Sequence, residues 1–217
     1  EDGVEHMWQA DPSVWGYHAP ILFPHCGKLV DGIMEAKGRT YASAPHGFAR
    51  LMEHQFVEQT EDTIVLELTD NEETYAKWPY HFRLVSTFRL EGDTLHHTLS
   101  VENRDEDKLP FGIGFHPAYA VPFDDKHQAT DYELRFSSME SPLCLSTQPT
   151  GLINGQCYYL GRNIRSLPID QNLFANDSHC MVNLSSKYFG IFEKDSRRGV
   201  VCKIEEFPYT LIWSKPG

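Results

Sequence analysis

The sequence has few of the features that stabilise secreted proteins or anchor proteins in membranes. Only five of its 217 residues are cysteine, an odd number without a Cys-x-x-Cys pair. A chain of this length buries enough surface to fold without disulfides. No apolar run approaches the roughly 18 residues that cross a bilayer. We therefore expect a soluble, cytoplasmic protein with a hydrophobic core and no membrane contact.

Positive charge is also scarce in this chain. Lysine and arginine total 19 against 31 aspartates and glutamates, which gives a formal net charge of −12 at pH 7. A surface of this sign repels phosphate backbones and anionic lipid headgroups. Nucleic acid is therefore not an expected partner.

The motifs of several common chemistries are missing as well. The sequence contains no Gly-x-Ser-x-Gly and no phosphate-binding loop, and Phe111–Phe115 continues into His-Pro rather than opening a helix. The eleven histidines show no His-x-His spacing, and His96 and His97, adjacent on a predicted strand, must point to opposite faces. Covalent serine chemistry, nucleotide binding, a metal site and a cofactor are therefore not predicted.

The sequence does contain many segments in which apolar and polar residues alternate with period two. These segments are residues 64–68, 82–90, 95–101, 132–136, 188–192, 200–204 and 210–213. Such alternation is typical of half-buried strands. No window of eleven or more residues has an apolar helical stripe, and no linker interrupts the chain. The pattern predicts an all-β fold of antiparallel strands, a sandwich or a barrel, with residues 1–217 as one domain.

Two histidines lie in an unusual local context. His116 stands between the glycine-rich segment 111–115 and Pro117, which favours an extended backbone at the histidine. His46 stands between Pro45 and Gly47. Taken alone, each histidine is more often a packed or capping residue than a catalytic one, and both interpretations stay open at this point.

Several motifs then combine into a pattern that covers essentially the whole chain. They are Trp8-Gln9-Ala10-Asp11-Pro12, Ala19-Pro20-Ile21-Leu22-Phe23-Pro24, Gly27-Lys28-Leu29, His46-Gly47-Phe48-Ala49-Arg50, Trp78-Pro79-Tyr80, Phe115-His116-Pro117-Ala118-Tyr119 and Trp213-Ser214-Lys215-Pro216-Gly217. Their order resembles that of the aldose 1-epimerase (galactose mutarotase-like) family, in particular its branch of LacX-type proteins. No single motif is decisive, and the resemblance rests on their shared order.

The resemblance implies a large antiparallel β-sandwich that binds a hexose in a cleft on one sheet. It also implies a reaction that interconverts the α and β anomers of an aldose without metal or cofactor. A carboxylate takes the proton of the C1 hydroxyl while an imidazolium protonates the ring oxygen, and the ring opens and closes again. Such chemistry needs an acid and a base whose pKa values are held apart by their environments.

The resemblance also assigns roles to individual residues. His116 matches the general acid, and His46 matches a second histidine that binds the sugar near its ring oxygen. Asp177 loosely matches an aspartate that binds sugar hydroxyls. Lys28 stands where relatives usually have an arginine, which keeps the charge but loses the planar donor pair. Arg50 resembles an arginine that contributes to phosphate binding in hexose-6-phosphate epimerases, or forms a structural ion pair.

The family pattern places the catalytic glutamate after the Trp-x-Lys-Pro-Gly segment, where this sequence stops at Gly217. Glu205 and Glu206 are upstream alternatives, but adjacent strand residues cannot share a face. The start also corresponds to a point inside the family pattern, so we expect a sandwich truncated at both ends. Edge strands exposed in this way favour association, such as a homodimer.

The resemblance is compatible with three functions, and a different feature of the sequence supports each of them. The first is an aldose 1-epimerase, indicated by His46, His116 and the order of the motifs. The second is a hexose-6-phosphate 1-epimerase, indicated by Arg50 but disfavoured by the net charge of −12. The third is a carbohydrate-binding or sensing module without catalysis, which the missing glutamate favours. The sequence does not name the sugar.

Overall fold

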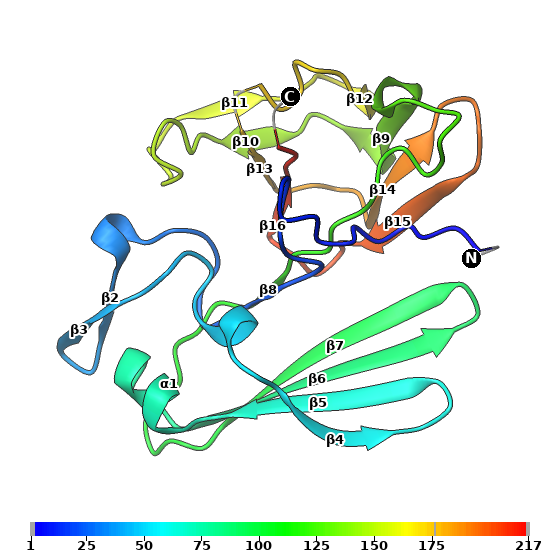
Figure 1. The fold of residues 1–217 in the computed structure, drawn as a ribbon. Coiled ribbons are helices and arrows are strands. Elements are labelled where there is room, and N and C mark those ends of the chain that lie inside the picture. Colours follow the sequence, from blue (N-terminus) through cyan, green and yellow to red (C-terminus); the bar gives the residue numbers. More distant parts are fainter. Residues whose placement is uncertain (1–2, 176, 216–217) are drawn as a thin grey trace. The chain divides into compact units, whose positions relative to one another are not determined.

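Antiparallel strands are the main regular elements of the computed structural model, which describes residues 3–175 and 177–215 (Figure 1). The contacts among these residues divide the chain into two units. Ala19–His116 form the first unit, and residues 3–18 together with 117–215 form the second. The prediction of an all-β fold with antiparallel sheets is confirmed.

The first unit contains one short α-helix, two 3₁₀ turns and eight strands. In chain order they are β1 (Ile21–Leu22), η1 (Val30–Gly32), β2 (Ile33–Ala36), β3 (Arg39–Ala42), η2 (Ala49–Leu51), β4 (Gln55–Gln59), β5 (Thr63–Thr69), α1 (Glu72–Lys77), β6 (Phe82–Glu91), β7 (Thr94–Asn103) and β8 (Gly114–Phe115). Strands β4, β5, β6 and β7 form one antiparallel sheet in that order, while β1 pairs with β8 and β2 with β3.

The four-stranded sheet follows the alternation read from the sequence. Figure 1 shows its strands side by side, from cyan β4 to green β7. Leu68 lies opposite Leu84, and Leu84 lies opposite Val101, so one face presents an apolar row across three strands. This row packs into a core with the buried aromatic rings of Phe23 and Trp78. Burying such aromatic side chains is a large favourable term in folding.

The α-helix α1 is one of several elements that the sequence pattern did not predict. It is only six residues long, too short for an apolar stripe. Asn71 caps its start: the Thr74 amide donates to Asn71 Oδ1 at 2.9 Å, and the Asn71 amide donates to Thr74 Oγ1 at 2.8 Å. Pro79 follows Trp78, which disfavours continuation of the helix. Caps at both ends define this helix, with little contribution from hydrophobic periodicity.

The second unit contains one 3₁₀ turn and eight strands. They are η3 (Ala129–Asp131), β9 (Tyr132–Glu140), β10 (Leu143–Leu145), β11 (Cys157–Tyr159), β12 (Ile164–Pro168), β13 (His179–Val182), β14 (Tyr188–Glu193), β15 (Gly199–Lys203) and β16 (Tyr209–Ile212). One antiparallel sheet has the order β12-β9-β14-β15, and the other has the order β11-β10-β13-β16.

These two sheets share one core and form a sandwich within the second unit. Phe136 of β9 and Phe189 of β14 come from the first sheet, and their rings lie 5.0 Å apart. Cys144 of β10 and Met181 of β13 come from the second sheet, and both are fully buried in the same cluster. In β9 the buried residues Tyr132, Leu134 and Phe136 are two positions apart, so their side chains face the same core.

Two of the motifs quoted above lie together in the second unit although they are far apart in the sequence. The ring of Trp15, just after the first motif, lies 6.1 Å from the ring of Trp213. Lys215 donates from Nζ to the backbone oxygen of Ser13 at 2.7 Å. Residues 7–18 are therefore held against the end of β16. Pro216 and Gly217 of the last motif lie outside the described residues.

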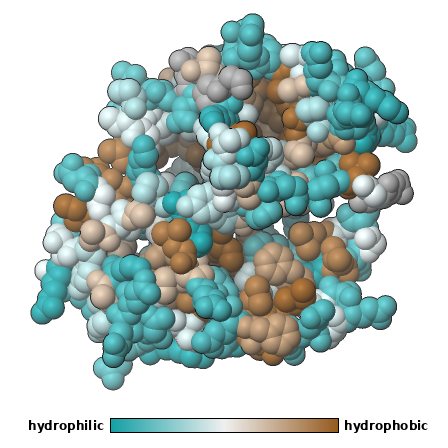
Figure 2. Space-filling model, in the orientation of Figure 1, coloured by the Kyte–Doolittle hydropathy of each residue, from teal (hydrophilic) through white to brown (hydrophobic). Residues whose placement is uncertain are grey.

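The surface is mostly polar, with apolar side chains between the polar ones. Figure 2 shows brown apolar patches among teal side chains on the face in view. On the sheet of the first unit the exposed apolar side chains include Phe56, Leu90 and Leu95. Among residues 3–175 and 177–215, no helix is both long enough and apolar enough to span a membrane.

Candidate active site

His46 occupies a tight turn whose backbone is fixed by several hydrogen bonds. Its φ is +69°, and that of Gly47 is +71°, so two consecutive residues are left-handed. The His46 amide donates to the Gly27 oxygen at 2.8 Å, and the Phe23 amide donates to the His46 oxygen at 3.2 Å. Left-handed backbone costs a side-chain-bearing residue energy, so the surrounding hydrogen bonds must hold His46 there.

The ring of His46 has a defined protonation state. The Gly27 amide donates to its Nδ1 at 3.1 Å, so Nδ1 acts as an acceptor and the single proton of the neutral ring lies on Nε2. Burial, as the largest cause, and the nearby charges of His116, Arg50 and His25 together lower the pKa of His46 to about 4. At neutral pH this side chain is therefore a neutral hydrogen-bond donor through Nε2.

His116 is brought to His46 by the pairing of two very short strands. β8 ends at Phe115, which lies opposite Ile21 of β1. The imidazole of His116 follows directly, and its centroid lies 5.7 Å from that of His46 with the two planes at 88°. Burial is the main cause that lowers the pKa of His116, and the positive charge of Arg50 contributes to the decrease. The structure thus brings together two histidines 70 positions apart in the sequence.

Arg50 belongs to η2, four residues after His46. Its charge lowers the pKa values of both His46 and His116. Arg50 also lines a hollow of about 170 Å³ together with Ile21, Ser86 and Phe88. Arg50 therefore lies close enough to act electrostatically on the two histidines.

Ser86, one of the residues that line this hollow, makes a buried polar contact on the sheet. Ser86, with no exposed surface, lies with Oγ 2.7 Å from Nε2 of His97. The His97 ring stacks on Phe88 at 4.0 Å and meets the Phe115 ring edge-on at 4.8 Å. Burial lowers the pKa of His97 to about 4. His97 thus packs a neutral ring against the residue that precedes His116.

The remaining predicted residues are placed less closely. Lys28 is exposed and adjacent to Gly27, whose amide binds the His46 ring. Asp177 belongs to the second unit, where its side chain is exposed and its φ is +70°. Glu205, a candidate base, is also in the second unit, where Lys187 at 2.6 Å lowers its pKa.

The sequence analysis did not assign roles to His25 and Gly27, which contact the His46 turn. His25 Nε2 lies 2.7 Å from Oγ of Ser43, and its charge is among those that lower the pKa of His46. The one sequence signal that could have pointed to His25 is its position between Pro24 and a cysteine. The Gly27 amide reaches the His46 ring across 19 positions of the sequence. A local sequence pattern does not reveal a contact over such a separation.

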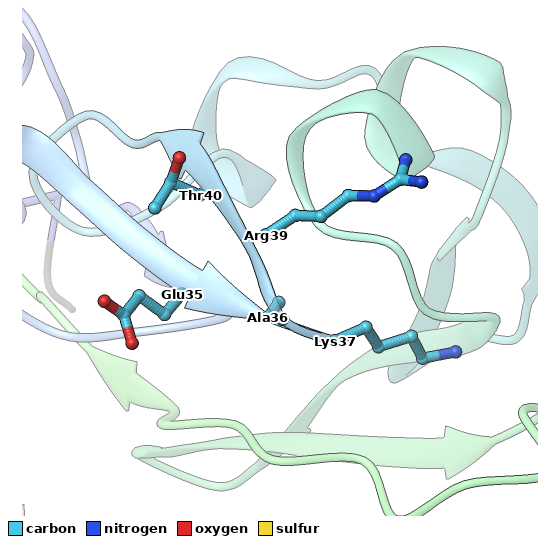
Figure 3. A pocket seen from close by; sticks show the side chains of 6 residues that line it. Glu35, Ala36, Lys37, Arg39 and Thr40 are labelled. Carbon is cyan, nitrogen blue, oxygen red and sulfur yellow. The ribbon is translucent and has the colours of Figure 1, made fainter.

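A larger hollow lies over the β2–β3 hairpin and lacks the features of a site. It measures about 290 Å³ and is lined by residues 35–40 (Figure 3). Figure 3 shows the carboxylate of Glu35 and the charged ends of Lys37 and Arg39 pointing in different directions. Lys37 instead forms an ion pair with Asp105 at 3.0 Å. Binding sites need converging polar groups, so the histidine pair is the better candidate.

In the part of the chain that the structure describes, no group of three or more His, Cys, Asp or Glu side chains is arranged to hold a metal ion.

The all-β fold and the two half-buried histidines agree with the class of galactose mutarotase-like proteins expected from the motifs. The chain belongs to the aldose 1-epimerase family, whose model matches residues 1–216. It is 32% identical over 223 aligned positions to the protein LacX, chromosomal, of Lactococcus lactis subsp. lactis, and the match covers 99% of this chain and 74% of LacX.

Two solved structures show the same fold. One is a galactose mutarotase related enzyme from Lactobacillus acidophilus, with a TM-score of 0.90, 27% identity and coverage of 97% of this chain and 70% of that one. The other is a galactose mutarotase-like protein from Lactobacillus casei ATCC 334, with a TM-score of 0.89, 27% identity and coverage of 99% and 74%. The galactose mutarotase-like sandwich expected from the motifs is therefore confirmed.

Proposed function

We propose that this protein interconverts the α and β anomers of a free hexose by opening and closing the sugar ring. The observation that carries this proposal is the pair of half-buried imidazoles of His46 and His116, 5.7 Å apart, in a chain of the aldose 1-epimerase family. Two imidazoles in different environments can supply different functions at one anomeric centre.

The proposed reaction transfers two protons. His116 in its protonated form donates a proton to the ring oxygen while a base removes the proton of the C1 hydroxyl. The bond between C1 and the ring oxygen breaks, and its electron pair goes to the ring oxygen, which becomes a hydroxyl. C1 becomes an aldehyde carbon. Rotation about the C1–C2 bond and closure on the opposite face return both protons.

His46 has a different role in this scheme. Its Nδ1 already accepts the Gly27 amide hydrogen, so only Nε2–H is available to the sugar. A neutral donor binds an oxygen near the ring and does not compete with His116 for protonation. The base is a carboxylate in the family pattern. Within the described chain, no carboxylate is among the groups that shift the pKa of either ring.

The proposal predicts catalysis by the protein with its natural ends. Freshly dissolved α-galactose or α-glucose should approach its equilibrium optical rotation faster with the protein than in buffer. Polarimetry measures this rate directly. Rotation that relaxes at the buffer rate over a range of protein concentrations contradicts the proposal. Saturable sugar binding in calorimetry without any acceleration would instead indicate a binding or sensing module.

The charge of Arg50 should set the pH dependence of catalysis. Only protonated His116 donates a proton, so the rate falls as pH rises through its pKa. Arg50 lowers that pKa. The Arg50→Gln variant should therefore raise the pKa of His116 and move the falling limb of kcat to higher pH. Rates measured by polarimetry between about pH 4 and 8 would show the shift.

Arg50→Lys is the matched control because it keeps the positive charge at the same position. Its falling limb should stay close to that of the wild type, although its hydrogen-bonding geometry differs. If the falling limb of kcat in Arg50→Gln moves to lower pH, or does not move, the electrostatic effect of Arg50 on His116 is contradicted.

Arg50 also supports a second candidate, the epimerisation of a hexose 6-phosphate. A guanidinium beside the histidine pair and at the edge of the 170 Å³ hollow fits a phosphate group. Glucose and glucose 6-phosphate compared in the same assay distinguish the two candidates. A higher kcat/KM for the phosphorylated sugar that is lost in Arg50→Gln favours the phosphate reaction. Equal or lower kcat/KM favours the free hexose.

A further inference from the structure

The strand that ends next to His116 is very short. β8 consists of Gly114 and Phe115, and it forms a two-stranded sheet with β1. Two strands paired over so few residues are not stable without further packing. Gly114 has no side chain, so Phe115 is the one residue of β8 whose side chain can anchor the strand. The position of His116 therefore depends on what holds the Phe115 ring.

His97 of β7 holds this ring from within the same unit. The two rings meet edge-on, with their centroids 4.8 Å apart and their planes at 69°. His97 lies opposite Phe88 in the pairing of β6 with β7, and these two rings stack at 4.0 Å. Edge-on and stacked aromatic pairs add to the free energy gained by burial. The His97 ring thus connects the four-stranded sheet to the end of β8.

Ser86 fixes the orientation of the His97 ring. Its Oγ lies 2.7 Å from Nε2 of His97, and Ser86 has no exposed surface. Rotation of the ring would break a buried hydrogen bond that water cannot replace, which costs free energy. The ring is therefore kept in the orientation in which it contacts Phe115.

This contact does not depend on charge. Burial lowers the pKa of His97 to about 4, so its ring is neutral at pH 7. The causes that shift the pKa of His116 are burial, a backbone hydrogen bond and the charge of Arg50. An effect of His97 on His116 is therefore one of packing, whereas Arg50 acts through its charge.

We propose that His97 is a positioning residue that holds Phe115 and thereby keeps the imidazole of His116 in place for proton transfer. Ser86 supports this role by fixing the His97 ring. The ring contacts reach β8 at the residue directly before His116. The part of this inference that concerns proton transfer rests on the proposed function. The placement of His116 does not.

The first test needs no sugar. In an NMR titration of the protein with its natural ends, the ring signals of His116 are those absent from His116→Ala. In His97→Ala the end of β8 should loosen and expose the His116 ring. The pKa of His116 should then rise, because burial is the main cause that lowers it. His46 and Arg50, which face His116, are unchanged in this variant.

His96→Ala is the matched control for this titration. His96 is the neighbouring residue of β7, and its exposed side chain points to the other face of the sheet. Its removal should leave the titration of His116 unchanged. A wild-type titration of His116 in His97→Ala would overturn the proposal.

Two further variants separate the aromatic ring from the hydrogen bond. The double variant His97→Phe, Ser86→Ala keeps a ring between Phe88 and Phe115 and removes both partners of the hydrogen bond together. Its titration of His116 should return close to that of the wild type. His97→Gln keeps a partner for Ser86 but loses the ring, so it should titrate like His97→Ala. If the double variant is folded, as urea unfolding shows, and yet titrates like His97→Ala, the ring contact does not position His116.

The second test measures mutarotation by the wild type and the same variants. In His97→Ala, kcat should fall about 3- to 10-fold, the size expected for one lost aromatic contact. KM should change by less than about twofold, because His46 remains to bind the sugar. The falling limb of kcat should move to higher pH, since the pKa of His116 is raised. In His96→Ala none of these should change.

A double-mutant cycle checks that the effect passes through Phe115. Phe115→Leu keeps an apolar side chain at the end of β8 but removes the ring that His97 contacts. In this background His97→Ala should lower kcat no further. An equal decrease of kcat in both backgrounds would show a general loss of stability and would overturn the positioning role.

The outcomes separate this inference from the proposed function. If the wild type does not accelerate mutarotation, the proposed function fails, and the NMR titrations alone decide whether His97 positions His116. If the wild type is active but His97→Ala has a wild-type titration and a wild-type kcat, the positioning role is wrong. A raised pKa of His116 with an unchanged kcat shows that His97 places the ring without supporting proton transfer, which also overturns the proposal as stated.

Discussion

Replacing His116 by alanine is expected to lower kcat for anomer interconversion by about 10²- to 10⁴-fold, the usual contribution of a positioned acid or base. The half-buried ring of His116 lies beside that of His46, and we expect no other group there to take its place as the proton donor. Polarimetry at several sugar concentrations gives kcat and KM separately. Because His46 remains to bind the sugar, KM should change much less than kcat.

A surface histidine provides the matched control for this substitution. His96 is exposed on the outer face of β7, where its Nε2 lies 3.2 Å from Glu91. His96→Ala removes the same side chain from the same unit and should leave kcat within about twofold of the wild type. Calorimetry should still detect sugar binding by His116→Ala. An alanine variant at position 116 with wild-type kcat would show that another group is the acid.

Replacing Gly47 by alanine should destabilise the protein by about 2–5 kcal/mol, the sum of a left-handed side-chain-bearing residue and an overpacked contact. An added Cβ would lie 2.3 Å from the backbone oxygen of Phe23. That oxygen accepts the amide hydrogens of Phe48 and Ala49 at 3.0 and 3.2 Å. The methyl group therefore displaces hydrogen-bonded backbone, which cannot rotate away as a flexible side chain would. Urea unfolding measures the loss.

Gly38 separates the two causes of this loss. Its φ is +72°, almost the same as that of Gly47, but nothing lies within 4 Å of an added Cβ. Gly38→Ala should therefore cost only the left-handed backbone energy, about 1–2 kcal/mol. Equal destabilisation of the two variants would show that the contact with Phe23 is unimportant. Activity should fall only in Gly47→Ala, because the neighbouring His46 then moves.

Much of the fold followed from local patterns in the sequence. The alternation in residues 64–68, 82–90 and 95–101 predicted β5, β6 and β7. The later segments with the same alternation became β9, β14 and β15. Period-two burial is a property of each strand by itself, so it is visible without knowing the partner strand. Helix α1 was missed because a single capped turn leaves no periodicity.

Less of the candidate site could be read in the same way. The Pro and Gly neighbours of His46 and His116 marked both residues as unusual, but not as neighbours of each other. Their 5.7 Å separation depends on the pairing of β1 with β8 and on the left-handed turn at His46. The donor to His46 Nδ1 is a backbone amide, which has the same chemistry in every residue except proline. No residue type in the sequence identifies it.

The sequence by itself determined the all-β class, the run of strands and the family, because hydrophobic periodicity and ordered motifs are local properties of the chain. Only the tertiary structure decided which nitrogen of His46 carries the proton and that Arg50 lowers the pKa values of both histidines. These features depend on distances between residues far apart in the sequence. Such distances are set by strand register and by the backbone of loops, which residue identity alone does not specify.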